Sequence, residues 1–241
     1  MKIYSKTDVG KMRHTNQDAF FAGELVPSGA LAIVCDGMGG ANAGNVASET
    51  AIKLISDYIL RSYRSGMDNF ELEKMVKNAM TSANIEIYEK AQKDISLSGM
   101  GTTAIVTLVI GNEAVIAHVG DSRVYLINDD IQQLTQDHSI VQSLVESGKI
   151  SPEAAKVHPR KNIITRALGV EEKLLIDTMS ITLGENDILL MCTDGLSSFV
   201  DSPKILEVVK TVPEEAVPEE LVNLANENGG GDNITVLTLG L

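Results

Sequence analysis

Long apolar segments and cysteines are both scarce in this 241-residue chain. Residues 1–8 contain no apolar core of a signal peptide, and the apolar run at residues 103–110 is far too short to span a membrane. The two cysteines, Cys35 and Cys192, lie inside apolar runs, which is typical of small buried side chains in a reducing compartment rather than of a disulfide framework. We therefore expect a cytoplasmic protein without membrane association.

Several common catalytic motifs are also absent from the sequence. It contains no G-x-x-x-x-G-K-[ST] phosphate loop, no H-E-x-x-H, no G-x-S-x-G nucleophile elbow and no H-R-D kinase loop. Acidic residues at the alternate positions of a calcium-binding loop are missing too. The four histidines (His14, His118, His138 and His158) are widely spaced and form no metal-ligand signature. Of these, His118 lies within a predicted strand and is more typical of a hydrogen-bonded structural residue than of a catalyst.

Acidic side chains dominate the charge of the chain. There are 33 Asp and Glu residues against 20 Lys and Arg residues, giving a formal net charge of −13. Such a charge repels phosphate backbones, so we expect no nucleic-acid partner. Part of the negative charge is available for a metal site.

Short β-rich runs predict strands at both ends and in the middle of the chain. They cover residues 3–7, 19–25, 30–35, 103–110, 114–119, 124–127, 174–182, 188–192 and 234–239. Residues 114–127 are interpreted as two strands about a Gly120-Asp121 turn, so at least part of the sheet is predicted to be antiparallel. Large β-containing domains reach this length, and we expect one domain over residues 1–241.

Helical periodicity predicts two long helices, at residues 43–64 and 70–94. In the second, one apolar stripe is formed by Leu72, Met75, Val76, Ala79, Met80 and Ala83. The two should form a hairpin that packs on a sheet. Shorter helices are predicted at Ser151-Pro152 and Ser202-Pro203, each a cap residue followed by proline, and a last one before Gly229. Helices segregated from antiparallel strands indicate an α+β fold.

Five aspartates recur where a predicted strand begins or ends. They are Asp18, Asp36, Asp121, Asp194 and Asp232. Any one of them alone is most simply a turn residue, because Asp-Gly and Gly-Asp are common turn signals. Together, carboxylates at neighbouring strand ends could converge on one edge of a sandwich, where their repulsion would be severe without cations. Hard oxygen ligands without a His/Cys pattern favour magnesium or manganese over zinc.

The order of six short motifs resembles that of type-2C metal-dependent protein phosphatases, the PPM family. The motifs are Arg13-His-Thr-Asn-Gln-Asp18, Asp36-Gly-Met-Gly-Gly40, Ser98-Gly-Met-Gly-Thr-Thr103, Gly120-Asp-Ser-Arg123, Thr193-Asp-Gly195 and Gly231-Asp-Asn233. The resemblance covers essentially the whole chain. In its lengths and spacings, the chain is most similar to the compact bacterial members that oppose eukaryotic-like Ser/Thr kinases.

This resemblance implies a four-layer α-β-β-α sandwich, in which two mainly antiparallel central sheets are flanked by helix pairs. It also implies a binuclear centre at one end, using two to three Mn²⁺ or Mg²⁺ ions. By position, Asp36 would bridge two ions, and the carbonyl of Gly37 would bind the first. Asp194 and Asp232 would bind the second. Asp18 would act directly or through water.

The resemblance assigns further roles around that centre. Asp121 matches the residue that recruits a weaker third ion, and Arg13 matches the arginine that grips the substrate phosphate. Asn233 and Thr102 would orient ligands or waters, although a purely structural role is an equal alternative. The implied reaction is direct attack by a water that bridges two metal ions. Met38 stands where some members have a histidine, so the general acid is not identified by the resemblance.

Residues 158–166 are unusually basic for so acidic a protein, and they match the position of a mobile flap beside the site in bacterial relatives. We expect a flap at about residues 145–168, with His158, Arg160, Lys161 and Arg166 docking the phosphoprotein. The alternative is an ordinary solvated loop. Expected partners are phosphorylated proteins, including a Ser/Thr kinase and its substrates, and we expect the chain to act as a monomer.

Two other functions are compatible with the same residues. One is a catalytically silent module that binds phosphoproteins, although the loss of a metal aspartate that would favour it is not seen. The other is a metal-dependent hydrolase of small phosphorylated molecules, which the predicted flap and the lack of a nucleotide motif make less favourable.

Overall fold

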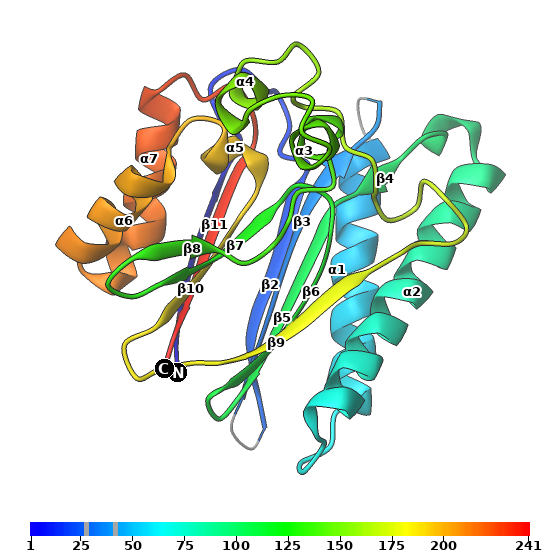
Figure 1. Ribbon diagram of the computed structural model, residues 1–241. Helices are drawn as coiled ribbons and strands as arrows, with labels where there is room; N and C mark the ends of the chain where they lie inside the picture. Colours follow the sequence, from blue (N-terminus) through cyan, green and yellow to red (C-terminus); the bar gives the residue numbers. More distant parts are fainter. Residues whose placement is uncertain (27–28, 41–42) are drawn as a thin grey trace.

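The computed structural model describes residues 1–26, 29–40 and 43–241, and its strands form two antiparallel sheets (Figure 1). One sheet has the order β1-β11-β10-β7-β8, formed by Lys2–Asp8, Ile234–Gly240, Ile188–Cys192, Arg123–Ile127 and Ile131–Gln133. The other has the order β2-β3-β5-β6-β9, formed by Asp18–Leu25, Gly29–Met38, Ala104–Ile110, Glu113–Val119 and Asp177–Thr182. The two-residue strand β4 (Gly101–Thr102) extends the pairing of β3.

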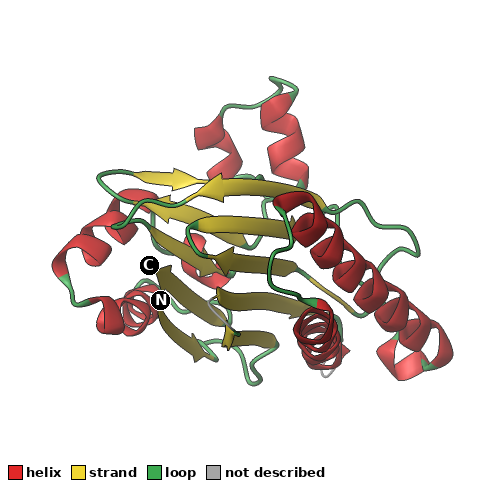
Figure 2. Ribbon diagram, turned by 90° about the horizontal axis from the view of Figure 1, so that it is seen from below, coloured by secondary structure: helices red, strands yellow, loops and turns green. Residues whose placement is uncertain are grey.

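A helix pair covers the outer face of each sheet. The pair α1 (Ala43–Ser62) and α2 (Asn69–Lys93) packs on the β2-β3-β5-β6-β9 sheet. The pair α6 (Ser202–Thr211) and α7 (Val217–Glu227) packs on the other sheet. Figures 1 and 2 show these pairs on opposite sides of the two sheets, so the predicted four-layer α-β-β-α sandwich is confirmed.

Three apolar layers hold the sandwich together, one between the sheets and one beneath each helix pair. Strand β5 contributes to two of them. Val106 and Leu108 face α1 and α2, whereas Ile105 and Val109 face the second sheet. Burial on both faces explains why this strand is a continuous apolar run rather than an alternating one. Each such side chain contributes about 1.5–3 kcal/mol of hydrophobic stabilisation.

The sequence located the long helices closely. Helix α2 begins after a capping box in which the Asp68 side chain accepts from the Glu71 N–H and the Glu71 side chain accepts from the Asp68 N–H. Its predicted apolar stripe is the buried face of the helix. Helix α4 (Pro152–Lys156) is capped by Ser151 as expected, but α6 is capped by Asp201, one residue before the predicted Ser202.

One topological prediction was wrong. Strands β6 and β7 do not form a hairpin, because β6 pairs with β5 and β9 while β7 pairs with β10 and β8 in the other sheet. The Gly120-Asp121 signal gives the sharp change of direction, with Gly120 at φ +111°, but it does not determine which strands pair. The turn is a crossing between the two sheets, and it carries Asp121 to their shared end.

Several short elements were not foreseen from the sequence. They are β8, β4, α3 (Ile140–Glu146), α5 (Asp194–Ser197) and the 3₁₀ turns η1 (Ile95–Leu97) and η2 (Glu214–Ala216). Strand β9 begins at Asp177 rather than at the predicted residue 174. Its pairing with β6 starts there, with Asp177 opposite His118. Among the described residues, no helix is long and apolar enough to cross a membrane.

Candidate active site

The five aspartates predicted from the sequence meet at one end of the sandwich. The pKa of the Asp36 carboxyl is raised well above its usual range by burial and by the charges of the other four. Burial also raises the pKa of Asp18 to about 7, and Asp194 and Asp232 add to the effect. This mutual repulsion shows that the carboxylates lie near one another at this end of the sandwich.

Two more of the half-buried carboxylates, Asp121 and Asp194, respond in the same way. Burial raises the pKa of Asp121 to about 7, with a further contribution from Asp194. Burial and the charge of Asp232 raise the pKa of Asp194 to about 6, which Asp36 and Arg13 partly offset. The site therefore holds several carboxyl groups that ionise less readily than a carboxyl group in water.

Asp18 is held from one side only. Its Oδ2 accepts hydrogen bonds from Thr193 Oγ1 at 2.9 Å and from Thr235 Oγ1 at 2.7 Å. Its Oδ1 is buried and has no hydrogen-bond partner among the described residues. A buried carboxylate oxygen without a partner is costly, and a cation or its water shell would satisfy it. Together with the all-oxygen donor set, this orphaned atom fits divalent cations of the magnesium and manganese type.

Two threonines fix the backbone at Asp36. Thr103 Oγ1 accepts from the Asp36 N–H at 2.9 Å, and Thr102 Oγ1 donates to the Asp36 carbonyl at 2.9 Å. Thr103 Oγ1 also lies 2.8 Å from Ser122 Oγ, next to Asp121. Thr102 therefore contacts the backbone of Asp36, and its role in orienting ligands or waters stays a prediction.

Glycines let the chain segments at this end approach one another closely. A Cβ on Gly195 would lie 1.9 Å from the Asn233 carbonyl oxygen, so only glycine lets the start of α5 reach the start of β11. A Cβ on Gly44 would lie 2.8 Å from the Gly37 carbonyl oxygen, the predicted metal ligand. These approaches bring Asp194 and the Gly37 carbonyl into the site.

Asn233 ties the loop before β2 to β11. Its Oδ1 accepts from the Gln17 N–H at 2.8 Å, and its Nδ2 donates to the carbonyls of Val9 and Thr15 at 2.9 and 3.0 Å. The same loop carries Arg13, whose Nη2 lies 2.8 Å from Asp232 Oδ2. Asn233 therefore acts on the loop that presents Arg13 at the edge of the carboxylate cluster.

A cleft of about 820 Å³ opens beside the cluster. Asp121 and Asp194 lie on its wall together with residues of α3, α4 and the start of α6. Of the four predicted docking residues, Lys161 lines this cleft, while His158 and Arg160 lie on the exposed loop outside its wall. Arg166 is engaged elsewhere, since its Nη1 donates to Asp177 Oδ1 at 2.9 Å.

Sequence reasoning missed four hydroxyl residues that support the aspartates: Thr103, Ser122, Thr193 and Thr235. Three of them, Thr103, Ser122 and Thr193, belong to the motifs quoted above, but no role was assigned to them. A hydroxyl next to an aspartate is too common to be informative until the strands are paired.

The donor set and its place at one end of a two-sheet sandwich define a metal-dependent hydrolase. Residues 11–226 match the family model of protein phosphatase 2C. The chain is 42% identical to the serine/threonine phosphatase stp of Listeria innocua, over 96% of this chain and 92% of that protein. The chain therefore belongs to the protein phosphatase 2C family of serine/threonine phosphatases.

Two solved structures resemble this chain along nearly their whole length. Serine/threonine phosphatase Stp1 from Staphylococcus aureus has a TM-score of 0.94 at 35% identity, covering 100% of this chain and 94% of that one. The catalytic domain of the phosphatase PstP, in complex with two manganese ions, has a TM-score of 0.84 at 34% identity, covering 98% of this chain and 96% of that one.

Proposed function

We propose that this phosphatase hydrolyses phosphoserine and phosphothreonine in proteins with two to three Mn²⁺ or Mg²⁺ ions. Asp36, the Gly37 carbonyl, Asp194 and Asp232 would hold two ions, with Asp18 supporting them. The observation that carries the proposal is the convergence of half-buried carboxylates whose pKa values are raised by one another, with Asp18 Oδ1 left unpaired. Bound cations would acidify an attacking water and neutralise charge on the phosphoryl group.

Arg13 is proposed to bind the phosphate of the substrate. Its guanidinium is half-exposed at the edge of the cluster, where its side chain pairs with Asp232. A planar guanidinium can donate to two phosphate oxygens at once, which orients the group as well as attracting it. When cations neutralise Asp232, Arg13 is freed to make that contact.

The cleft beside the carboxylates is proposed to receive the protein chain around the phosphoresidue. Residues 145–168 would act as a flap along one side, and Lys161 would contact acidic or phosphorylated segments of the substrate. His158 and Arg160, which lie on the exposed loop, would make outer docking contacts. Arg166 would hold the base of the flap through Asp177 rather than contact the substrate directly.

The biological role follows from the chemistry of the substrate. A phosphoserine or phosphothreonine must first be made by a Ser/Thr kinase, so the phosphatase would oppose that kinase and could act on the kinase itself. We place this reaction in the cytoplasm, in keeping with two free, buried cysteines, and we propose that the chain works as a monomer.

The test is phosphate release from a phosphothreonine peptide by the purified protein. It is measured with Mn²⁺, with Mg²⁺ and after chelation, for the wild type and for Asp36→Asn. Turnover that requires metal and is lost in the variant is the expected result. A folded wild-type protein that releases no phosphate with either metal would contradict the proposal and favour a phosphoprotein-binding module.

A further inference from the structure

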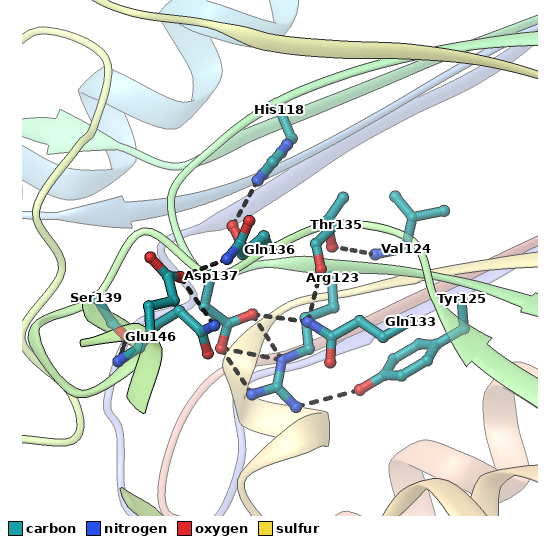
Figure 3. A network of polar contacts seen from close by, with 11 residues as sticks. His118, Arg123, Val124, Tyr125, Gln133, Thr135, Gln136, Asp137, Ser139 and Glu146 are labelled. Atoms are coloured by element: carbon teal, nitrogen blue, oxygen red, sulfur yellow. Dashed lines mark hydrogen bonds and ion pairs between the residues drawn. The ribbon is translucent and has the colours of Figure 1, made fainter. Parts of the chain in front are cut away.

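A short segment at residues 134–139 braces the turn that carries Asp121. The Leu134 N–H donates to the Val124 carbonyl at 2.8 Å, and Thr135 Oγ1 accepts from the Val124 N–H at 3.0 Å. Arg123 forms a bidentate pair with Asp137, with Nε at 3.0 Å from Oδ1 and Nη2 at 2.7 Å from Oδ2. Figure 3 shows the contacts of Thr135 with Val124 and of Asp137 with Arg123, which join the segment to the start of β7; we name this segment the brace.

Within the brace, His138 makes two contacts with one residue of the turn. Its backbone N–H donates to the Gly120 carbonyl at 2.9 Å, and its ring Nδ1 accepts from the Gly120 N–H at 3.1 Å. Both backbone polar groups of Gly120 are therefore bound by His138. The turn has little freedom on its other side, because a Cβ on Gly120 would lie 2.5 Å from the Thr103 side chain.

The ring of His138 is itself fixed by its surroundings. Its Nε2 lies 3.1 Å from Asp177 Oδ2, and its face stacks on the His118 ring with centroids 4.5 Å apart. Because Nδ1 accepts a hydrogen bond, the proton of the neutral ring belongs on Nε2, where it donates to Asp177. Burial lowers the pKa of His138, and the nearby Arg166 guanidinium also disfavours a second proton.

A metal site at this cluster is the alternative, since His118, His138 and Asp177 offer ligand atoms within 4.8 Å of one another. The contacts argue against it. The Nδ1 of His138 is already used, its Nε2 has Arg166 Nη1 only 3.1 Å away, and His118 Nε2 is bonded to the Gln136 carbonyl at 3.0 Å. The Arg166 guanidinium beside His138 Nε2 repels a cation. The cluster therefore fixes the His138 ring against the Gly120-Asp121 turn instead of binding a metal.

We propose that His138 is a positioning residue for Asp121: by holding the Gly120 N–H through Nδ1, it sets the turn so that the Asp121 carboxylate can bind the weaker third cation. Asp177 and Arg166 keep the ring in the required orientation. This inference rests on the proposed function, because it concerns a cation of the same centre. It goes beyond that function because it assigns to His138 of the brace the role of positioning Asp121.

The test is Mn²⁺ binding to the metal-free full-length protein, followed by calorimetry and by electron paramagnetic resonance. In His138→Asn, the Oδ1 atom can take the place of Nδ1 and accept from Gly120. In His138→Gln and His138→Leu it cannot, since glutamine extends to the position of Nε2 and leucine has no acceptor. Thermal unfolding of each metal-free variant reports whether the fold is retained.

We expect the weakest Mn²⁺ binding step to weaken about 10- to 100-fold in the Gln and Leu variants, as for other residues that orient metal ligands. The tighter steps should be unchanged, and the Asn variant should bind close to wild type. Equal third-ion affinity in all variants would overturn the inference, as would equal weakening of every step or a wild-type stoichiometry of two. A folded wild type that binds no Mn²⁺ would instead overturn the proposed function.

Discussion

Asp18 and Asp36 stand directly opposite each other on the antiparallel strands β2 and β3. Directly paired residues project from the same face of a sheet, and like charges in this arrangement are destabilising. The fold nevertheless places both carboxylates at the end where Asp194 and Asp232 also raise their pKa values. The metal-free protein therefore carries repulsion at this end that bound cations would relieve.

Replacing Asp36 by asparagine should separate activity from stability. Asp36→Asn removes a proposed ligand that lies among the other four carboxylates, so we expect phosphate release to fall on the order of 10³-fold, a rise of about 4 kcal/mol in the barrier. The metal-free variant should unfold at a higher temperature than wild type, because its folded state no longer buries a carboxyl group whose ionisation burial and the neighbouring charges oppose. Asp232→Asn should lose activity in the same way. Full metal-dependent activity in either variant would contradict the binuclear assignment.

The stability of the metal-free protein should depend on pH with a definite sign. Asp18 and Asp121 have a pKa of about 7 and Asp194 about 6 in the folded chain, against an ordinary value of 3.8. The folded state therefore binds more protons, and this stability is present below about pH 4 and is lost as the pH rises through 6 to 7.

Thermal unfolding in chelator at pH 5 and at pH 8 measures this effect. We expect the melting temperature to be lower at pH 8, and Asp194→Asn, which removes one titrating group, should flatten the dependence. Saturating Mn²⁺ should diminish the loss, since cations bind the deprotonated carboxylates. A melting temperature in chelator that does not fall between pH 5 and pH 8 would count against the raised pKa values.

Arg13 is expected to act mainly on substrate binding. Arg13→Ala removes a charge-assisted pair with the phosphate, so the KM for a phosphopeptide should rise about tenfold or more, with a smaller effect on kcat. Arg13→Lys keeps the charge but not the planar fork, and should give an intermediate KM. Steady-state kinetics at saturating Mn²⁺ measure both constants. An unchanged KM in Arg13→Ala would refute the phosphate role.

The close approach at Gly195 should make it intolerant of any side chain. Because a Cβ there would lie 1.9 Å from a backbone oxygen, Gly195→Ala must push α5 away from β11. We expect a loss of about 1–3 kcal/mol in the free energy of unfolding, as for other overpacked sites, and weaker Mn²⁺ binding. Gly184→Ala is the matched control, because its nearest neighbour would be 3.5 Å away. Equal unfolding midpoints in urea for the two variants would contradict this prediction, because they would show that α5 and β11 can move apart at little cost.

Much of the fold was predictable because buried positions carry apolar residues, whose spacing can be read in the sequence. The stripe from Leu72 to Ala83 identified the face of α2, and the continuous apolar run of β5 reflected burial on both faces. The five aspartates were predictable as a set because each adjoins such a run. The apolar pattern does not show which strands pair. The Gly120-Asp121 turn was therefore interpreted as joining two paired strands, although β6 and β7 lie in different sheets.

The supporting contacts were beyond the reach of sequence for the same reason. Thr193 and Thr235 bind Asp18 across 175 and 217 residues of chain, so β10, which ends just before Thr193, must first be paired in register with β11. His138 was grouped with the other histidines as lacking any signature. Its contact with Gly120 depends on a segment that returns to the sheet after β8.

The pairing of β1 with β11 sets Lys2 opposite Gly240, and Figure 1 draws the two chain ends side by side. At the far end of the same pair, Asp8 lies opposite Ile234, next to the carboxylates. A surface, a fluorophore or a second protein attached at either terminus would thus stand a full strand length from the cleft. A short linker could also join the two ends, so that the chain could be reopened in an exposed loop such as the one around Gly66 without cutting any strand.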